Sequence, residues 1–261
     1  MNNALSNGST KAVFVAGLHR SATTMTHFVA GSHPDCVALG EIWNLISNPA
    51  QLKRANEIDC SCGKYAAECS FWGPLFPKLQ GDGDYAPVVE HFHNLYGRDR
   101  IMVDSSKHFE AHAALSQRVD VTKVLFCIRD VRGWVVSNRL PAWKGFVRWY
   151  RANRRQRALF DVTDTLLVSY EELVLNPEPY VQKVFNHVGL ESSGEAIQFG
   201  QTEHHAIMCN RMKGDAGKMA GMKYDTRWLY DRNFGLVSLM LPWIVRYNSK
   251  NVYGNVENLF K

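Results

Sequence analysis

The stretch that decides the fold is "KAVFVAGLHRSATTMTHF", residues Lys11–Phe28. Its first part, Lys11–Gly17, is a continuous apolar run that ends in glycine, which predicts a buried parallel strand. Beyond the loop, the apolar side chains of Met25, Phe28 and Val29 have helical spacing. A strand, a tight loop and a helix are therefore expected to follow one another directly.

This arrangement favours an anion-binding site. Backbone N–H groups at the start of a helix point at a ligand there, and the helix dipole favours negative charge. Gly17 lets the chain turn, and Arg20 offers a permanently charged fork that suits a tetrahedral oxyanion. Thr23 and Thr24 add hydroxyl donors. The loop lacks the lysine with which nucleotide triphosphatases hold the β and γ phosphates, so a ligand that needs no metal is expected.

Further apolar runs alternate with helical patterns along the chain. This alternation predicts an α/β fold, with three α/β/α layers around a central parallel sheet. The predicted strands after the first are Cys36–Glu41, Arg100–Ser106, Thr122–Asp130 and a run in Asp164–Val174 that passes into a turn.

We expect one domain over residues 1–261, with a polar tail at 1–10 and a loop-rich insertion at 51–86. Residues 200–225 read as a polar, flexible tail, and Leu236–Val245 as a buried C-terminal helix. No run of about 18 apolar residues occurs, and the N-terminus lacks the pattern of a signal peptide, so a cytoplasmic location is expected. The net charge of +5 suits an anionic ligand or a membrane surface, and is too small to indicate nucleic acid.

Three of the six cysteines, Cys60, Cys62 and Cys69, lie within ten residues. A structural zinc site needs four ligands, and no second CxxC or HxxxH pattern stands nearby. No bound metal is therefore expected. A local disulfide and a packed cluster of thiols both remain open.

A second anion site is indicated by "FCIRDVRGWVVSNR". Arg129 stands at the end of a predicted buried strand, and Ser137 follows eight residues later, about two helical turns along. An arginine and a serine together suit a phosphate. The alternative is a surface ion pair between Arg129 and Asp130.

Together these two elements resemble the 5′-phosphosulfate loop and the 3′-phosphate motif of sulfotransferases that use 3′-phosphoadenosine 5′-phosphosulfate (PAPS). The resemblance is to bacterial-type members with a P-loop-like fold, and it covers roughly Val13 to Trp228. Three further segments also resemble such members: "VSYEELVLNPEPYVQKVFNHVGL", "HHAIMCNRMK", and "CSCG" followed by "CSFW".

The resemblance implies a set of residues that bind PAPS and its product, adenosine 3′,5′-bisphosphate (PAP), without a metal. For the 5′-phosphosulfate these are His19, Arg20, Ser21, Ala22, Thr23 and Thr24; for the 3′-phosphate, Arg129 and Ser137; for the adenine, Tyr170; and for closure over the cofactor, Asn210 and Lys213.

Tyr170 has an alternative role as a packed aromatic residue at a strand end. The sequence departs from the family pattern at three positions. Ala22 replaces a glycine, so ordinary backbone angles are expected there. Cys209 replaces another glycine, and Lys213 replaces an arginine.

Sulfuryl transfer needs a base for the acceptor and cations for the moving group. Glu41, at the end of a predicted strand, is our candidate base; its alternative role is an acid in the first turn of a helix. His108 is the rival base. Lys107 is expected at the transferred group, with Asp104 orienting it, or else in solvent. His19 is expected to act as a neutral donor.

The acceptor stays open among a sugar, a lipid-like alcohol or amine, a phenol and a tyrosyl peptide. The aromatic and basic stretch Leu140–Arg157 could line a pocket or contact an anionic membrane surface, or its aromatic residues could simply pack inward. Two other functions remain as alternatives. One is an ATP-dependent phosphotransferase of similar fold, and the other is an inactive protein that binds PAP. The oligomeric state is not indicated.

Overall fold

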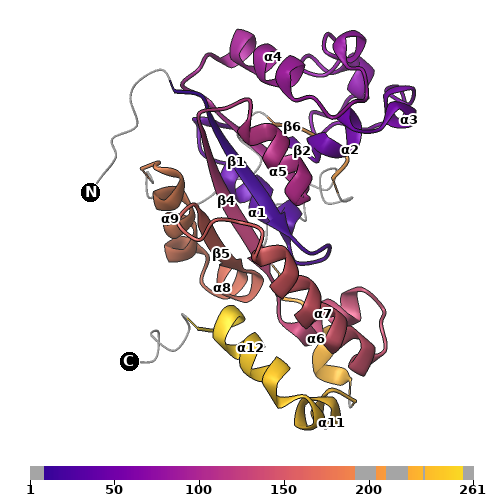
Figure 1. The fold of residues 1–261 in the computed structure, drawn as a ribbon, viewed down its shortest axis with the longest axis vertical. Helices are drawn as coiled ribbons and strands as arrows, with labels where there is room; N and C mark the ends of the chain where they lie inside the picture. Colours follow the sequence, from indigo (N-terminus) through magenta and orange to yellow (C-terminus); the bar gives the residue numbers. More distant parts are fainter. Residues whose placement is uncertain (1–8, 192–203, 210–222, 232, 255–261) are drawn as a thin grey trace.

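A computed structural model describes residues 9–191, 204–209, 223–231 and 233–254. Its centre is one sheet of six strands in the order β5-β4-β1-β3-β2-β6, with every neighbouring pair parallel (Figure 1). The strands are β1 (Lys11–Gly17), β2 (Cys36–Gly40), β3 (Ile101–Lys107), β4 (Val121–Ile128), β5 (Thr165–Ser169) and β6 (His204–Ile207). The predicted parallel α/β fold is confirmed.

Helices cover both faces of this sheet. They are α1 (Thr23–Gly31), α2 (Ile42–Ile46), α3 (Pro49–Leu52), α4 (Ala86–Tyr96), α5 (Phe109–Ser116), α6 (Val131–Ser137), α7 (Ala142–Arg157), α8 (Tyr170–Leu175), α9 (Pro177–Val188), α11 (Asn233–Met240) and α12 (Pro242–Val252). Short 3₁₀ turns lie at Ala66–Glu68, Phe76–Lys78 and Arg227–Tyr230.

The two faces of β1 belong to two separate cores, because successive side chains of a strand point to opposite sides. Phe14 packs in a core with residues of α2, α4, α5 and the 51–86 insertion. Val13 and Val15 pack in a second core with α1, α8 and α9. A third cluster, of α6, α7, α11 and α12, includes Ile128 at the end of β4.

The strand register gathers the carboxyl ends of the central strands. Ala16 of β1 pairs with Lys107 of β3, and Gly17 pairs with Cys127 of β4. The loop after β1 therefore begins between Lys107 on one side and the end of β4 on the other. Ligands of parallel α/β folds bind beyond this edge of the sheet.

Three sequence expectations about local structure are wrong. Residues 204–207 of the expected flexible tail form β6, a buried edge strand beside β2. The expected turn after β5 is the helix α8, because the Ser169 hydroxyl accepts from Glu172 N and caps it. The expected buried C-terminal helix is split at Pro242, and its first part leaves Leu239 and Met240 81% and 67% exposed.

The aromatic residues of α7 divide between core and surface. Phe146 and Trp149 are fully buried, whereas Trp143 is 60% exposed. The interpretation of this helix as one that packs its aromatic side chains inward therefore holds for Phe146 and Trp149. Among the described residues, no helix is both long enough and apolar enough to cross a membrane.

Gly17 should tolerate no side chain, because it has a φ of +128° and a Cβ there would collide with the Cys127 carbonyl oxygen. We expect Gly17→Ala to lower the free energy of unfolding by about 3 kcal/mol or more, through strain and crowding together. Gly97→Ala is the control, since Gly97 also has a positive φ (+81°) but has open space around it. That variant should lose about 2 kcal/mol, through backbone strain alone. Equal losses in denaturant unfolding would contradict the crowding argument.

Candidate active site

The loop between β1 and α1 is built from left-handed backbone angles. Arg20 and Ala22 both have a φ of 69°, although neither is glycine. The expectation of ordinary backbone angles at Ala22 is therefore wrong. The chain closes one turn with Ser21 N donating to Leu18 O at 3.1 Å, and begins α1 with Thr26 N donating to Ala22 O at 3.0 Å. These bonds over-determine the angles, which cost an alanine about 1–2 kcal/mol.

The backbone N–H groups at the start of α1 are not capped by a side chain. Ala22 occupies the N-cap position, where an alanine has no group to accept from the helix amides. Ser21 is 1% exposed, and its Oγ has no hydrogen-bond partner among the described residues. A buried hydroxyl without a partner, beside uncapped helix amides, fits an anionic group.

Arg129 lies directly beside this loop. Its Nη1 donates to the carbonyl oxygen of Arg20 at 3.3 Å, and its Nη2 contacts Asp225 Oδ2 at 2.6 Å. Its Nε is buried and has no partner in the described part of the chain. A Cβ on Gly133 would lie 3.0 Å from this Nε, so the glycine leaves room for the guanidinium.

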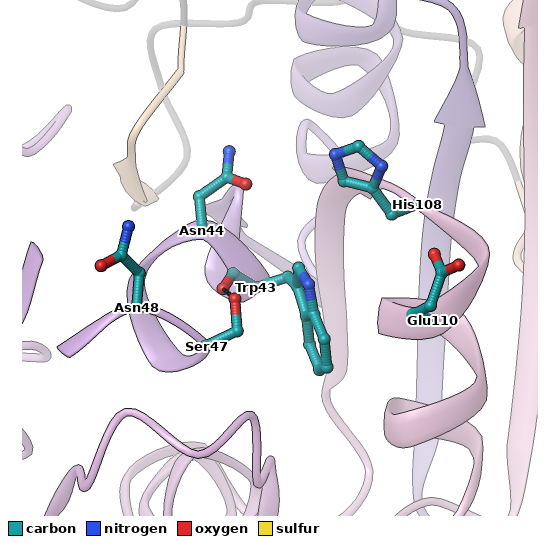
Figure 2. Close-up of a pocket in the computed structure, with 6 residues that line it drawn as sticks. All are labelled: Trp43, Asn44, Ser47, Asn48, His108 and Glu110. Atoms are coloured by element: carbon teal, nitrogen blue, oxygen red, sulfur yellow. Dashed lines mark hydrogen bonds between the residues drawn. The ribbon is translucent and has the colours of Figure 1, made fainter.

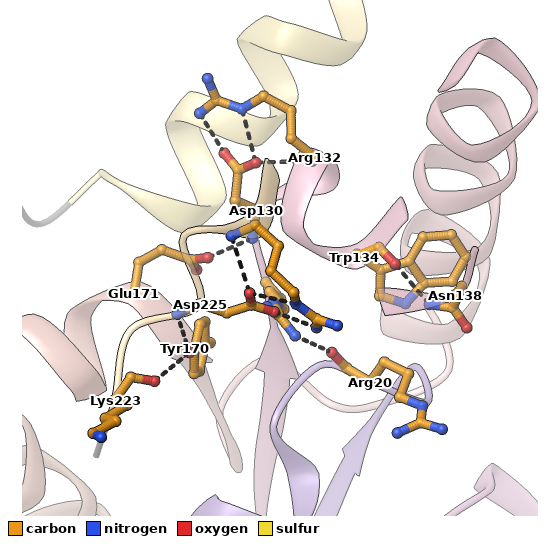
Figure 3. A network of polar contacts seen from close by, with 11 residues as sticks. Arg20, Asp130, Arg132, Trp134, Asn138, Tyr170, Glu171, Lys223 and Asp225 are labelled. Carbon is orange, nitrogen blue, oxygen red and sulfur yellow. Dashed lines mark hydrogen bonds and ion pairs between the residues drawn. The ribbon is translucent and has the colours of Figure 1, made fainter. Parts of the chain in front are cut away.

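The alternative pairing of Arg129 with Asp130 is not what the structure has. The carboxylate of Asp130 accepts instead from Arg132 at 2.8 Å (Figure 3). It also accepts from Asn248 Nδ2 at 2.8 Å. Ser137, the predicted partner of Arg129, is the half-buried last residue of α6. No hydrogen bond joins Ser137 to Arg129 within the described ranges, so its role stays a prediction.

Tyr170 is packed rather than open. Its ring stacks on Tyr224, and its hydroxyl donates to Lys223 O at 3.0 Å and accepts from Asp225 N at 2.9 Å (Figure 3). The guanidinium of Arg129 lies 4.6 Å from the centre of the same ring. Tyr170 is thus a packed aromatic residue beside the arginine, and its contact with adenine stays a prediction. Asn210 and Lys213 lie outside the described residues.

A buried ion pair joins the ends of β2 and β3. Lys107 Nζ donates to Glu41 Oε1, while Asn44 Nδ2 donates to Glu41 Oε2 at 2.6 Å. Lys107 is 4% exposed, so the expectation of a solvated lysine is wrong. Glu41 does stand at the N-cap of α2, but its side chain forms no capping hydrogen bond. The ion pair places a carboxyl group and a lysine side chain together at this edge of the sheet.

The two histidines complete the group. The rings of His19 and His108 have their centres 6.4 Å apart. The pKa of His19 is lowered by burial first and then by the charge of Lys107, against the opposing effect of Glu41. A lowered pKa favours the neutral ring, which can donate one hydrogen bond. The residues predicted at separate strand ends therefore meet at one edge of the sheet.

A pocket of about 370 Å³ opens beside this group. Side chains of α2 and the turn after it lie on one side, and His108 and Glu110 lie on the other (Figure 2). Asn44, which lines the pocket, also holds the Glu41 carboxylate. Asn44 therefore links the lining of the pocket to the candidate base.

A sequence model of the sulfotransferase family matches residues 12–194. The chain belongs to the sulfotransferase family. Among solved structures, it is similar to the sulfotransferase domain from the curacin biosynthetic pathway (TM-score 0.53, 12% identity, covering 89% of this chain and 98% of that one). It is also similar to the sulfotransferase domain of the Synechococcus PCC 7002 olefin synthase (TM-score 0.53, 16% identity, 92% and 96% covered). At these identities the likeness concerns the fold. A search of curated proteins gave no match.

Sequence reasoning missed some residues of this sulfotransferase site. Asn44 lies three residues after Glu41, a spacing that puts both on one helix face, so its contact with the acid could have been found. Asp225, which contacts Arg129, is 96 residues away in sequence and carries no local signal. Nothing in the sequence distinguishes Gly133 from other helix glycines, because its role depends on its contact with the Arg129 side chain.

Asp104 does not orient Lys107 as expected. It accepts from the Tyr85 hydroxyl (2.5 Å), Ser106 N (2.8 Å) and the Ser106 hydroxyl (2.5 Å). Ser106 Oγ in turn accepts from Trp43 N at 2.9 Å, which fixes the start of α2 behind Glu41. Complete burial raises the pKa of Asp104 from 3.8 to about 6, against the lowering effect of these bonds.

This raised pKa predicts a pH dependence of stability. Between pH 4 and 6 the folded state binds more protons than the unfolded state, so the contribution of Asp104 falls as pH rises. We expect a loss of about 2 kcal/mol in unfolding free energy between pH 4 and 7, relative to Asp104→Asn, which cannot titrate. Denaturant unfolding of both proteins at several pH values measures it. Parallel curves would show that Asp104 keeps an ordinary pKa.

Proposed function

We propose that the chain transfers the sulfuryl group of PAPS to a hydroxyl or amine of a small acceptor. The observation that carries the proposal is a pair of buried polar atoms without partners among the described residues, Ser21 Oγ and Arg129 Nε. They belong to neighbouring elements, since Arg129 also donates to the carbonyl of Arg20. A ligand with two separate anionic groups would satisfy both.

The residues present suit such a ligand. The uncapped amides of α1, with Ser21, Thr23 and Thr24, would hold the 5′-phosphosulfate, and Arg20 would add its charge. Arg129 would hold the 3′-phosphate, with Ser137 as the predicted second donor. Tyr170, beside the guanidinium, would support the nucleoside through its ring.

PAPS, when bound, supplies an activated sulfuryl group whose bond to the 5′-phosphate oxygen breaks as the acceptor binds the sulfur. The electron pair of that bond leaves with the phosphate. The chain has to remove the acceptor proton and neutralise the charge that builds on the phosphate. Glu41 would take the proton, held in orientation by Asn44. Lys107 and Arg20 would stabilise the negative charge.

The acceptor would occupy the pocket beside Glu41. Three of its lining residues, Asn44, Ser47 and Asn48, carry amide or hydroxyl groups, and His108 and Glu110 are also polar. Such a lining favours an acceptor with several hydrogen-bonding groups, such as a sugar or a polar amine, over a purely apolar alcohol. Trp43 would offer a flat face to it.

Binding of PAP tests the donor. At a hundred times its dissociation constant, PAP should add about 2.7 kcal/mol to the unfolding free energy, seen as a rise in Tm. Arg129→Ala should abolish this rise, whereas Arg148→Ala, at an exposed position of α7, should keep it. A rise with ATP and magnesium but not with PAP would contradict the proposal, as would an unchanged rise in Arg129→Ala.

Turnover of Glu41→Gln tests the base. The variant should keep the PAP-induced rise in Tm and lose about 10²- to 10⁴-fold in kcat, since a glutamine cannot accept the proton. His108→Ala should keep most of the activity. Transfer from labelled PAPS to a panel of sugars and amines provides the assay. If His108→Ala is inactive and Glu41→Gln is not, His108 is the base.

A further inference from the structure

A cluster of thiols and one imidazole that the sulfuryl-transfer proposal does not use lies where the 51–86 insertion meets β6. It consists of Cys60, Cys62 and Cys69 of the insertion and His205 of β6. Their ligand atoms all lie within 4.8 Å of one another. Cys60 Sγ is 3.6 Å from Cys69 Sγ, and Cys69 Sγ is 3.2 Å from His205 Nδ1. The fourth ligand that the sequence did not reveal is thus supplied from 136 residues away.

The spacing agrees with a tetrahedral metal centre. With Zn–S near 2.3 Å and Zn–N near 2.1 Å, a tetrahedron places sulfur atoms about 3.8 Å apart and sulfur and nitrogen about 3.6 Å apart. The Cys60–Cys69 and Cys69–His205 separations are 3.6 Å and 3.2 Å. Small rotations of the side chains would bring all four ligands to a common centre.

We propose that Cys60, Cys62, Cys69 and His205 bind a structural zinc ion. Three thiolates and one imidazole form one of the usual four-ligand sets of structural zinc, and such a closed set leaves no position for a substrate. Soft sulfur ligands disfavour magnesium and calcium, which take oxygen ligands. The site is thereby separate from sulfuryl transfer, for which no metal is expected.

The backbone around the cluster holds the ligands in place without the metal. Cys60 N donates to Lys64 O, and Gly63 N donates back to Cys60 O, closing a tight turn around Cys62. The backbone N–H groups of Phe71 and Trp72 face the Cys69 sulfur. Such N–H groups stabilise thiolate charge, and a site with three thiolates around one divalent ion has a surplus of it.

The insertion is also hydrogen-bonded to the backbone of β6 at His205 and at Ala206. Trp72 Nε1 donates to the carbonyl oxygen of His205 at 2.6 Å. Ser61 N donates to Ala206 O at 2.9 Å, and Ala206 N donates to Ser61 Oγ at 2.8 Å. These bonds fix the position of His205 relative to the cysteines, so the ligand set is preorganised.

A disulfide between Cys60 and Cys69 explains fewer of these contacts than a zinc ion does. A bond between Cys60 and Cys69 would use two of the four groups, leaving Cys62 and His205 gathered at the same point for no reason. The three cysteines are thiols in the structure, and the 3.6 Å between Cys60 and Cys69 sulfur atoms far exceeds the disulfide length of about 2.05 Å.

The zinc would stabilise the neighbourhood of Glu41. Ile207 lies two residues after His205 on β6, and its carbonyl oxygen accepts from Glu41 N at 3.0 Å. Tying β6 to the insertion therefore holds the end of β2, from which Glu41 comes. Loss of the metal should lower the Tm of the whole chain.

Metal analysis of the full-length protein, purified with its thiols reduced, tests the proposal. We expect one zinc per chain by mass spectrometry, and after replacement by Co²⁺ the visible absorption of a tetrahedral cobalt–thiolate centre. Cys62→Ser should weaken Zn²⁺ binding by at least about 100-fold, as measured by competition with a chelator. Cys62 is exposed, so this variant should fold. Lys64→Ser, an exposed position in the same turn, is the matched control and should bind Zn²⁺ as tightly as the parent.

Three results would overturn the proposal. One is reduced protein that takes up no Zn²⁺. Another is Cys62→Ser with the same zinc affinity as Lys64→Ser. The third is zinc-free protein as isolated in which thiol titration shows that Cys60 and Cys69 are joined. His205→Gln provides a second check, because it should also lose Zn²⁺ while keeping all three thiols titratable.

Discussion

The site depends on one buried ion pair, between Glu41 and Lys107. These residues follow and end neighbouring strands, and Lys107 holds a left-handed φ of 70° to reach the acid. Removing either partner would leave a buried, unpaired charge, which destabilises proteins by about 3–5 kcal/mol. The same contact therefore stabilises the carboxyl edge of the sheet and keeps an acid and a cation beside the loop after β1. Both the stability of the fold and the proposed chemistry therefore need Glu41 and Lys107 to be paired.

A second polar network fixes the other half of the site. Asp130 accepts from Arg132, Asn248 and the Tyr253 hydroxyl, and its N–H donates to Glu171. The carbonyl of the preceding residue accepts from Trp149 Nε1 at 3.1 Å. The backbone that carries the Arg129 side chain is thus held by α6, α7, α8 and α12 together. A rigid backbone fixes the position of the guanidinium, which an arginine that binds an anion requires.

The central fold could be predicted because its strands, such as Lys11–Gly17, are apolar on both faces and alternate with helical patterns. The edge strand could not, since a segment with His204 and His205 in place of an apolar run becomes a strand only against β2 and the insertion. Glu41 and Lys107 could be placed at strand ends, but their mutual contact depends on which strands are neighbours. The left-handed angle of Ala22 was missed because alanine has no preference for it, and surrounding hydrogen bonds impose it.

The contact between the insertion and β6 affects whether two chains of this protein can associate through the edge of the sheet. β6 is the last strand of the sheet, and the edge of a sheet normally presents unpaired backbone groups that can recruit a strand from another chain. Ser61 occupies both the N–H and the carbonyl oxygen of Ala206 on that side. The cysteine-bearing loop thereby blocks this part of the edge, and its displacement would expose backbone groups with which a strand of another chain could pair.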